Sequence, residues 1–165
     1  FLGARPVEWL LENCDVGERF HLVHATHLTS DETMRLARSG ANVVLCPSTE
    51  GNLGDGIFPL REFKEHGGRW SLGTDSHIGL NPFEELRLLD YGQRLTTHKR
   101  NTFGNDAGKY AIETATFAGR RAMNNFETEF FAVGAKFEFC VVDSDAPLLA
   151  DVGTDNRTSA IVYTT

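Results

Sequence analysis

The stretch WSLGTDSH, residues 70–77, decides the fold prediction, because an apolar run ends at Leu72 and polar residues follow at once. The same order recurs upstream, where the apolar residues of 20–23 lead into His24 and the apolar run 43–46 leads into a long polar segment. Strand, polar loop and helix thus recur three times at a spacing of roughly 25 to 30 residues, the length of a βα unit with its crossover. The sequence therefore predicts parallel βα architecture.

Three strands are predicted from this alternation, at Phe20–His24, Asn42–Cys46 and Trp70–Gly73. Because parallel strands need crossover connections, we expect helices between them, lying on one side of the sheet. The stretch Pro47–Gly56, rich in Gly, Asn, Ser and Thr, is predicted to be a long loop.

Capping residues mark the expected helix boundaries. Pro6 opens a first helix, at a position where the missing N–H costs nothing. A T-x-x-E capping box at Thr29–Glu32 starts the next helix, which Gly40 ends. Asn81, with Pro82 directly after it, begins another. The remaining helices are expected at Ile57–His66, Ala107–Phe117 and Gly119–Asn124.

The chain changes to a β pattern after residue 130, with strands expected at Phe137–Val142 and Ser159–Tyr163. These strands are expected to belong to a separate small sheet. We therefore expect two parts: residues 1–125 with the βα units and the helices that follow them, and residues 126–165 contributing strands to a small β-sandwich domain.

Composition limits the classes of partner. The 16 basic and 23 acidic residues give a net charge of −7, without a Lys/Arg cluster that could neutralise a run of phosphates, so a nucleic-acid partner is not expected. No apolar run approaches the ~20 residues that span a bilayer, so no membrane partner is expected and we expect a soluble, cytoplasmic protein. Cys14, Cys46 and Cys140 lack C-x-x-C spacing, which predicts reduced thiols.

Residues that bind metals or move protons stand at two of the strand ends. Asp75 follows the third strand with no helix to cap for several residues, and His24 follows the first. The C-terminal ends of parallel strands open on a common face, so the two side chains are expected to converge on one pocket. The plainer alternatives are an Asx turn for Asp75 and a loop histidine bound to backbone for His24. His27 lies three residues after His24, and strand alternation places the two on opposite sides, so one of them is expected to face the pocket.

Cys46 ends the second strand and has two interpretations. As a thiol nucleophile with a histidine base nearby in space, it would define a zinc-independent hydrolase. As a small buried hydrophobic residue, it would only pack, and this second interpretation is favoured.

The strand ends also carry a family resemblance. The segments LVHATHLT (22–29), LCPSTEGNLGDGIFP (45–59) and GTDSH (73–77) resemble the last three strand-loops of a metal-dependent amidohydrolase barrel. More narrowly, the N-L-G-D-G-x-F-P loop, the R-P-V-E-W-L-L opening and the E-E-L-R-x-L-x-Y-G-Q-R-L helix are similar to the formimidoylglutamate deiminase family of histidine degradation. The resemblance covers about the first 125 residues and is weaker beyond them.

This resemblance implies an α/β fold, namely the C-terminal portion (about strands 6 to 8) of a TIM-type (β/α)8 barrel, which is typically ~250 residues long. It also implies that the family's first-strand H-x-H pair, its fifth-strand histidine and the nearby proton shuttle precede Phe1. The 165 residues are then expected to be an incomplete part of the enzyme and inactive alone. A homodimer is expected for the full-length enzyme.

The resemblance also assigns roles to residues. His24 matches the histidine after the sixth barrel strand, which polarises the substrate's C=N carbon centre and the attacking water. Asp75 matches the aspartate after the eighth strand, which binds one divalent metal, Zn²⁺, and takes the proton from the water. The implied reaction converts N-formimino-L-glutamate to N-formyl-L-glutamate and ammonia. Asn52, Ser76 and His77 are candidates for positioning the substrate or supporting Asp75.

Two other classes of protein share parts of this pattern. Another deaminase or a chlorohydrolase of the amidohydrolase superfamily would use the same strand ends. A non-catalytic, flavodoxin-like α/β binding module would show the same alternation, but Asn52–Gly56 is only a weak version of its Gly-rich phosphate loop. Metal analysis of the full-length protein separates this module and the Cys46 hydrolase from the deiminase.

Overall fold

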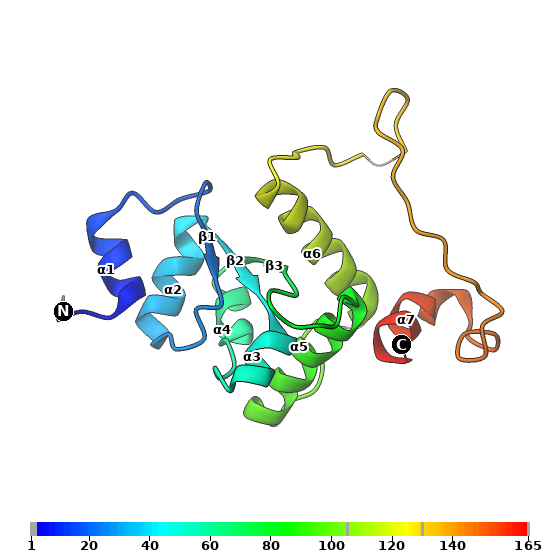
Figure 1. Ribbon diagram of the computed structural model, residues 1–165, viewed down its shortest axis with the longest axis horizontal. Coiled ribbons are helices and arrows are strands. Elements are labelled where there is room, and N and C mark those ends of the chain that lie inside the picture. Colours follow the sequence, from blue (N-terminus) through cyan, green and yellow to red (C-terminus); the bar gives the residue numbers. More distant parts are fainter. Residues whose placement is uncertain (1–2, 105, 130, 165) are drawn as a thin grey trace.

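The computed structural model describes residues 3–104, 106–129 and 131–164. Its centre is a parallel sheet in the order β1 (His21–Val23), β2 (Asn42–Leu45) and β3 (Arg69–Leu72) (Figure 1). In register, Leu22 lies opposite Val43 and Val43 opposite Trp70. The prediction of three parallel strands is confirmed.

Hydrogen bonding continues one residue beyond the strands at their C-terminal ends. The His24 N–H donates to the carbonyl of Val44, and the Gly73 N–H donates to the carbonyl of Leu45, both at 2.9 Å. These bonds fix the first residues of the loops after β1 and β3 against β2, and so bring both loops to one edge of the sheet.

Helices surround this sheet (Figure 1). They are α1 (Pro6–Asn13), α2 (Ser30–Ser39), α3 (Pro47–Leu53), α4 (Leu60–Glu65), α5 (Pro82–Thr97), α6 (Ala107–Ala122) and α7 (Arg157–Thr164), with a short 3-10 helix η1 (Thr154–Asn156) before α7. None of the helices in these described ranges is long and apolar enough to cross a membrane.

The predicted caps are present. Thr29 Oγ1 accepts from the Glu32 N–H at 3.2 Å while Glu32 Oε2 accepts from the Thr29 N–H at 2.8 Å, which completes the capping box of α2. Gly40 ends α2 with φ 81°, a left-handed conformation that a side chain disfavours. Asn81 Oδ1 accepts from Phe83 N–H at 2.9 Å at the start of α5.

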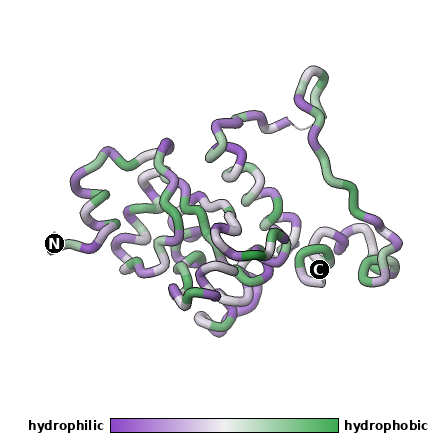
Figure 2. Tube along the Cα trace, in the orientation of Figure 1, coloured by the Kyte–Doolittle hydropathy of each residue, from purple (hydrophilic) through white to green (hydrophobic). Residues whose placement is uncertain are grey.

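The core lies on one face of the sheet. Val43, Leu45 and Trp70 point to this face and are fully buried, and Trp70 stacks on Phe103 with ring centroids 5.6 Å apart. The helix residues that pack against them include Leu36, Phe63, Leu86 and Leu89. In Figure 2 the hydrophobic positions lie along the strands in the middle of the molecule. Each such buried side chain contributes about 1.5–3 kcal/mol, so the core holds the strand ends in place.

Helix α6 corrects two predictions. It is one continuous helix rather than two, because Gly119 lies inside it without breaking it. It packs along β3, and a Cβ on Gly119 would lie 3.8 Å from Cβ of Ser71. By strand alternation Ser71 faces away from the side on which Trp70 is buried. At Gly119, α6 therefore lies on the other face, while its residue Ala111 belongs to the core with Trp70, so the expectation of helices on one side holds only in part.

Residues 47–53 form helix α3, whereas the sequence predicted a loop there. Pro47 supplies the fixed φ that suits a first helical position. Glu85 of α5, a buried carboxylate, accepts from the Ser48 N–H at 2.9 Å and so stabilises the start of α3 from another element. This tertiary bond was not visible in the local sequence.

The predictions of strands at Phe137–Val142 and Ser159–Tyr163 are also wrong. Residues 137–142 are extended but pair with no strand in the described chain, and 159–163 lie inside helix α7. Short apolar runs fit either structure, and here α7 packs on α5 and α6, where the Tyr163 hydroxyl donates to Asp90 Oδ2 at 2.6 Å. The apolar tail segment, residues 131–142, leaves Phe131, Phe137 and Val141 exposed, and Figure 2 shows much of it as hydrophobic.

Candidate metal and proton-transfer site

Three potential ligand side chains meet at the C-terminal edge of the sheet, one after each strand. His24, Cys46 and Asp75 each bring a ligand atom to within 4.8 Å of the other two. His24 Nε2 lies 3.5 Å from Asp75 Oδ2. The structure thus brings together the two residues that the sequence singled out, for the reason predicted: parallel strands end on a common face.

The backbone at this edge is unusual. His24, Ala25 and Asp75 have φ of 66°, 52° and 50°, in the left-handed region that residues with a side chain rarely adopt. Such conformations cost of order 1–3 kcal/mol each and tend to cluster at functional sites. Here they turn both loops directly after the strands, so that the His24 and Asp75 side chains face each other.

Sequence reasoning missed Glu50, which holds the other side of the His24 ring. Its Oε1 lies 3.2 Å from His24 Nδ1 and accepts from the Cys46 N–H at 2.9 Å. Burial raises the pKa of Glu50, and the bonds from Cys46 and His24 oppose that rise. The sequence predicted a loop at residues 47–53, and Glu50 faces the strand ends only because these residues form helix α3.

Exposure differs sharply within the cluster. The side chain of Glu50 is 5% exposed, while those of His24 and Asp75 are 34% and 40% exposed. Water and a small substrate can therefore reach His24 and Asp75, whereas Glu50 can act only through the groups that it touches.

Cys46 is a poor nucleophile in this setting. Burial raises the pKa of its thiol to about 12, with further contributions from the negative charges of Glu50, Asp75 and Glu85. The thiolate is the reactive form, and it is scarce at neutral pH under these conditions. The Cys46 hydrolase interpretation thus loses its chemical basis, and the buried position fits the favoured packing role.

The other sequence candidates lie around the cluster. Thr49 Oγ1 donates to the Thr74 carbonyl at 2.9 Å and accepts from the His77 N–H at 3.1 Å, which ties the loop after β3 to α3. His77 Nδ1 accepts from the Gly79 N–H at 3.0 Å. Asn52 and Ser76 are exposed, and neither belongs to the three-residue ligand group.

His27 lies away from the ligand group. Its carbonyl accepts from the Arg5 guanidinium, and its ring lies over Gly56, where a Cβ would come within 3.5 Å of Cε1. As predicted, one of the two histidines of the β1 loop joins the cluster and the other does not.

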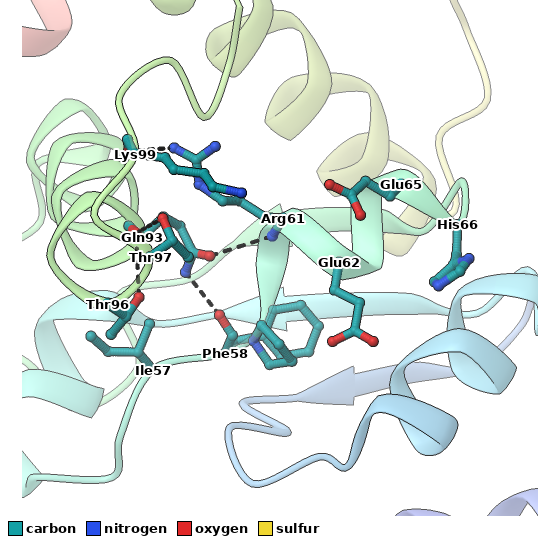
Figure 3. A pocket seen from close by; sticks show the side chains of 11 residues that line it. Ile57, Phe58, Arg61, Glu62, Glu65, His66, Gln93, Thr96, Thr97 and Lys99 are labelled. Atoms are coloured by element: carbon teal, nitrogen blue, oxygen red, sulfur yellow. Dashed lines mark hydrogen bonds between the residues drawn. The ribbon is translucent and has the colours of Figure 1, made fainter.

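A groove on the outer layer is a separate feature. It has a volume of about 560 Å³ and lies between α4 and α5 (Figure 3). Its Gln93 side chain donates to the Phe58 carbonyl and accepts from the Arg61 N–H, while Arg61 donates to the carbonyls of Lys99 and Arg100. These polar groups hold the two helices together, and none of His24, Cys46 and Asp75 lines the groove.

The donor set suits a divalent metal in part. Zinc binds imidazole nitrogen and carboxylate oxygen, which His24 and Asp75 offer at an open position. The third atom is the Cys46 sulfur, whose raised pKa disfavours the thiolate that zinc requires. Among the residues that the structure describes, Asp75 with His24 beside it therefore fits a catalytic metal.

The chain belongs to the amidohydrolase family, whose model matches residues 3–165. It is 45% identical over 157 residues to a formimidoylglutamate deiminase of Pseudomonas aeruginosa, covering 93% of this chain and 34% of that protein. It is 36% identical over 153 residues to a 5-methylthioadenosine/S-adenosylhomocysteine deaminase of Halobacterium salinarum, covering 91% of this chain and 35% of that protein. The chain spans about a third of the length of these curated relatives.

Solved structures show the same relationship. An amidohydrolase from Brucella melitensis superposes with a TM-score of 0.74 and 42% identity over 76% of this chain and 29% of that one. An adenosine deaminase from Xanthomonas campestris with bound zinc superposes with a TM-score of 0.67 and 26% identity over 76% of this chain and 28% of that one. The three parallel strands and their helices are thus an α/β part of the amidohydrolase fold.

Proposed function

We propose that the whole protein is a metal-dependent deiminase that hydrolyses N-formimino-L-glutamate to N-formyl-L-glutamate and ammonia. The observation that carries this proposal is the approach of His24 Nε2 to within 3.5 Å of Asp75 Oδ2 at the strand ends, in a chain 45% identical to a formimidoylglutamate deiminase. Both side chains are partly exposed, so they can meet a small substrate.

Asp75 is proposed as a ligand for zinc, with His24 as its neighbour. When bound, zinc supplies Lewis acidity, which lowers the pKa of a water from ~15.7 toward ~7. The donor types of His24 and Asp75 support this assignment, and a relative with bound zinc has the same part of the fold.

The side chains of this chain would handle the protons. Water oxygen forms a bond to the formimino carbon, and one water proton passes to the Asp75 carboxylate. The bond from that carbon to the terminal nitrogen then breaks. Both protons of the water end on this nitrogen, one of them by way of Asp75, and the nitrogen leaves as ammonia. His24, across from Asp75, orients the water and the C=N group by hydrogen bonding through Nε2.

The remaining assignments extend this proposal. Asn52, Ser76 and His77 are proposed to contact the substrate or support Asp75, since His77 and Thr74 are tied to the same α3 residue. Residues 1–125 and 126–165 are proposed as separate domain contributions, with α7 of the second part packed on α5 and α6 of the first. The whole protein is proposed to be a homodimer.

A second candidate is a deaminase of another amidohydrolase-family substrate. The 36% identity to a 5-methylthioadenosine/S-adenosylhomocysteine deaminase favours it over any class outside the family. A substrate panel that includes N-formimino-L-glutamate and 5-methylthioadenosine separates the two, because each enzyme releases ammonia from its own substrate.

The test measures ammonia release by the whole protein and its variants. Asp75→Asn and His24→Ala are each expected to reduce turnover of N-formimino-L-glutamate by about 10²-fold or more, since each loses a group that moves or orients a proton. Asp31→Asn, at an exposed position on α2, is the matched control and should retain the rate. Near-wild-type ammonia release by either site variant removes that residue from the mechanism.

A further inference from the structure

The His24 ring lies between two carboxylates. Its Nδ1 is 3.2 Å from Glu50 Oε1, and its Nε2 is 3.5 Å from Asp75 Oδ2. An uncharged imidazole carries one hydrogen, so only one of these two nitrogens can donate. Which nitrogen carries the hydrogen decides what the ring offers to the side of Asp75.

Glu50 is held more firmly than Asp75. The same Oε1 that contacts His24 also accepts from the Cys46 N–H at 2.9 Å, and the side chain is buried. The helix that carries Glu50, α3, is itself held at its start by Glu85 through the Ser48 N–H at 2.9 Å. Asp75, in contrast, is 40% exposed on a loop. The fixed partner of the ring is therefore Glu50.

We propose that Glu50 is a positioning residue for His24, which it holds with the hydrogen on Nδ1 so that the bare Nε2 faces Asp75 and the reaction space between them. A carboxylate only accepts hydrogen bonds, so Nδ1 must donate to it. Nε2 then accepts from a water or from the substrate's N–H. This proposal rests on the proposed function for its kinetic consequence, but the state of the ring can be measured without substrate.

The bond to Cys46 offers a simpler role for Glu50, namely to satisfy a backbone N–H at the start of α3. A purely structural role would affect stability and would leave the histidine tautomer unchanged. Glu32 provides the matched control, because it is also a buried carboxylate that accepts backbone N–H groups, those of Thr29 and Glu8. No described contact joins it to the His24 ring.

The experiment records ¹⁵N spectra of the whole protein labelled with ¹⁵N-histidine, since a ring nitrogen that carries a hydrogen and one that does not have well-separated shifts. The signals of His24 are assigned by their loss in His24→Gln, and spectra are taken across about pH 6 to 9, where a histidine ring becomes uncharged. We expect a single tautomer, with the hydrogen on Nδ1, in the wild type, in Glu50→Gln and in Glu32→Ala. Glu50→Ala is expected to show a mixture of tautomers.

A second experiment measures kcat for the same variants. Glu50→Ala is expected to lower kcat by about 10- to 100-fold, the usual effect of removing a partner that orients a functional histidine, and Glu50→Gln to restore most of it because its amide oxygen still accepts. Should wild-type protein fail to act on N-formimino-L-glutamate, the proposed function is wrong, and the spectra still decide the role of Glu50.

Two results would overturn the proposal. One is a wild-type ring that carries its hydrogen on Nε2, or on both nitrogens throughout the pH range, and this needs no variant to fold. The other is a Glu50→Ala protein whose His24 keeps the wild-type tautomer, in which case any loss of rate comes from structural damage. If Glu50→Ala does not fold, the wild-type spectrum decides, because a hydrogen on Nε2 excludes donation from Nδ1 to Glu50.

Discussion

Glu32 joins α1 to α2, and its removal tests how the first helix is held. Its Oε2 accepts from Arg5 Nε at 2.7 Å and from the Thr29 N–H at 2.8 Å, while Oε1 accepts from the Glu8 N–H at 3.2 Å. The carboxylate is buried, but Arg5 is exposed. We predict that Glu32→Ala loosens α1 while the sheet stays folded.

The size of the effect follows from these bonds. The reciprocal bond of the capping box joins Thr29 to Glu32 within α2, so it does not hold α1. The Arg5 pair adds about 0.5 kcal/mol, because an exposed partner is screened by water, and the Glu8 N–H adds about 0.5 kcal/mol, because water can replace that bond at a helix start. The sum of the two contacts to α1, about 1 kcal/mol, corresponds to roughly 5-fold faster local opening, at 1.4 kcal/mol per factor of ten.

Hydrogen exchange followed by mass spectrometry measures this opening in peptides that cover residues 6–13. Glu12→Ala, an exposed position on the same helix, is the control and should leave the exchange rate unchanged. Exchange in Glu32→Ala within twofold of the wild type would refute the reasoning, because the bonds of Glu32 would then contribute nothing to holding α1.

The same contact predicts a pH dependence. Burial alone raises the pKa of Glu32, but the hydrogen bonds from Thr29, Arg5 and Glu8 outweigh it, so the pKa is lowered from its usual 4.5. A lowered pKa means that this stabilisation is present above pH 4.5 and is lost as the pH falls through the folded-state pKa. Protection of α1 should therefore fall on acidification in the wild type and change less in Glu32→Ala.

Three further predictions concern other parts of the chain. Burial raises the pKa of the Cys46 thiol to about 12. Cys46 should therefore react with iodoacetamide at pH 7.5 at least about tenfold more slowly than the exposed Cys140. Equal labelling of the two thiols by peptide mass spectrometry would contradict the burial of Cys46. Tyr163→Phe removes one donor from Oδ2 of the buried Asp90, which keeps its contact with Arg94, at a cost of about 0.5–1.5 kcal/mol, so α7 should be cleaved faster in limited proteolysis than in the wild type; an unchanged rate would mean that this bond does not hold α7. The 165 residues alone should bind zinc weakly and release no ammonia, because Asp75 with neighbouring His24 falls short of the three ligands of a catalytic zinc; submicromolar stoichiometric binding by calorimetry together with turnover would overturn this.

The sequence determined the sheet and its polar edge. Apolar runs that end in polar residues, separated by capped helices, admit few arrangements other than parallel strands with crossovers. The three parallel strands, the capping box of α2 and the start of α5 all agree with what the sequence predicts. The approach of His24 to Asp75 follows from the same pattern, because parallel strands open their C-terminal ends on one face.

Only the tertiary structure decided the elements whose local pattern was ambiguous. Residues 47–53 became a helix through a bond from Glu85, which lies far along the chain, and residues 159–163 became a helix because α7 packs on α5 and α6. Residues 137–142 have the composition of a strand, but a strand also needs a partner for its backbone, and none lies beside them in the described chain.

The site residues also divide into those that the sequence predicted and one that only the tertiary structure showed. His24 and Asp75 could be predicted as site residues because each follows an apolar strand. Glu50 could not, because it lies in a stretch whose composition predicts a polar loop. Its contact with His24 depends on the turn of α3 and on the Cys46 N–H, both of which exist only after the strands and helices have packed. Strand ends can therefore be placed from local pattern, but the partner that orients a side chain depends on bonds between distant elements.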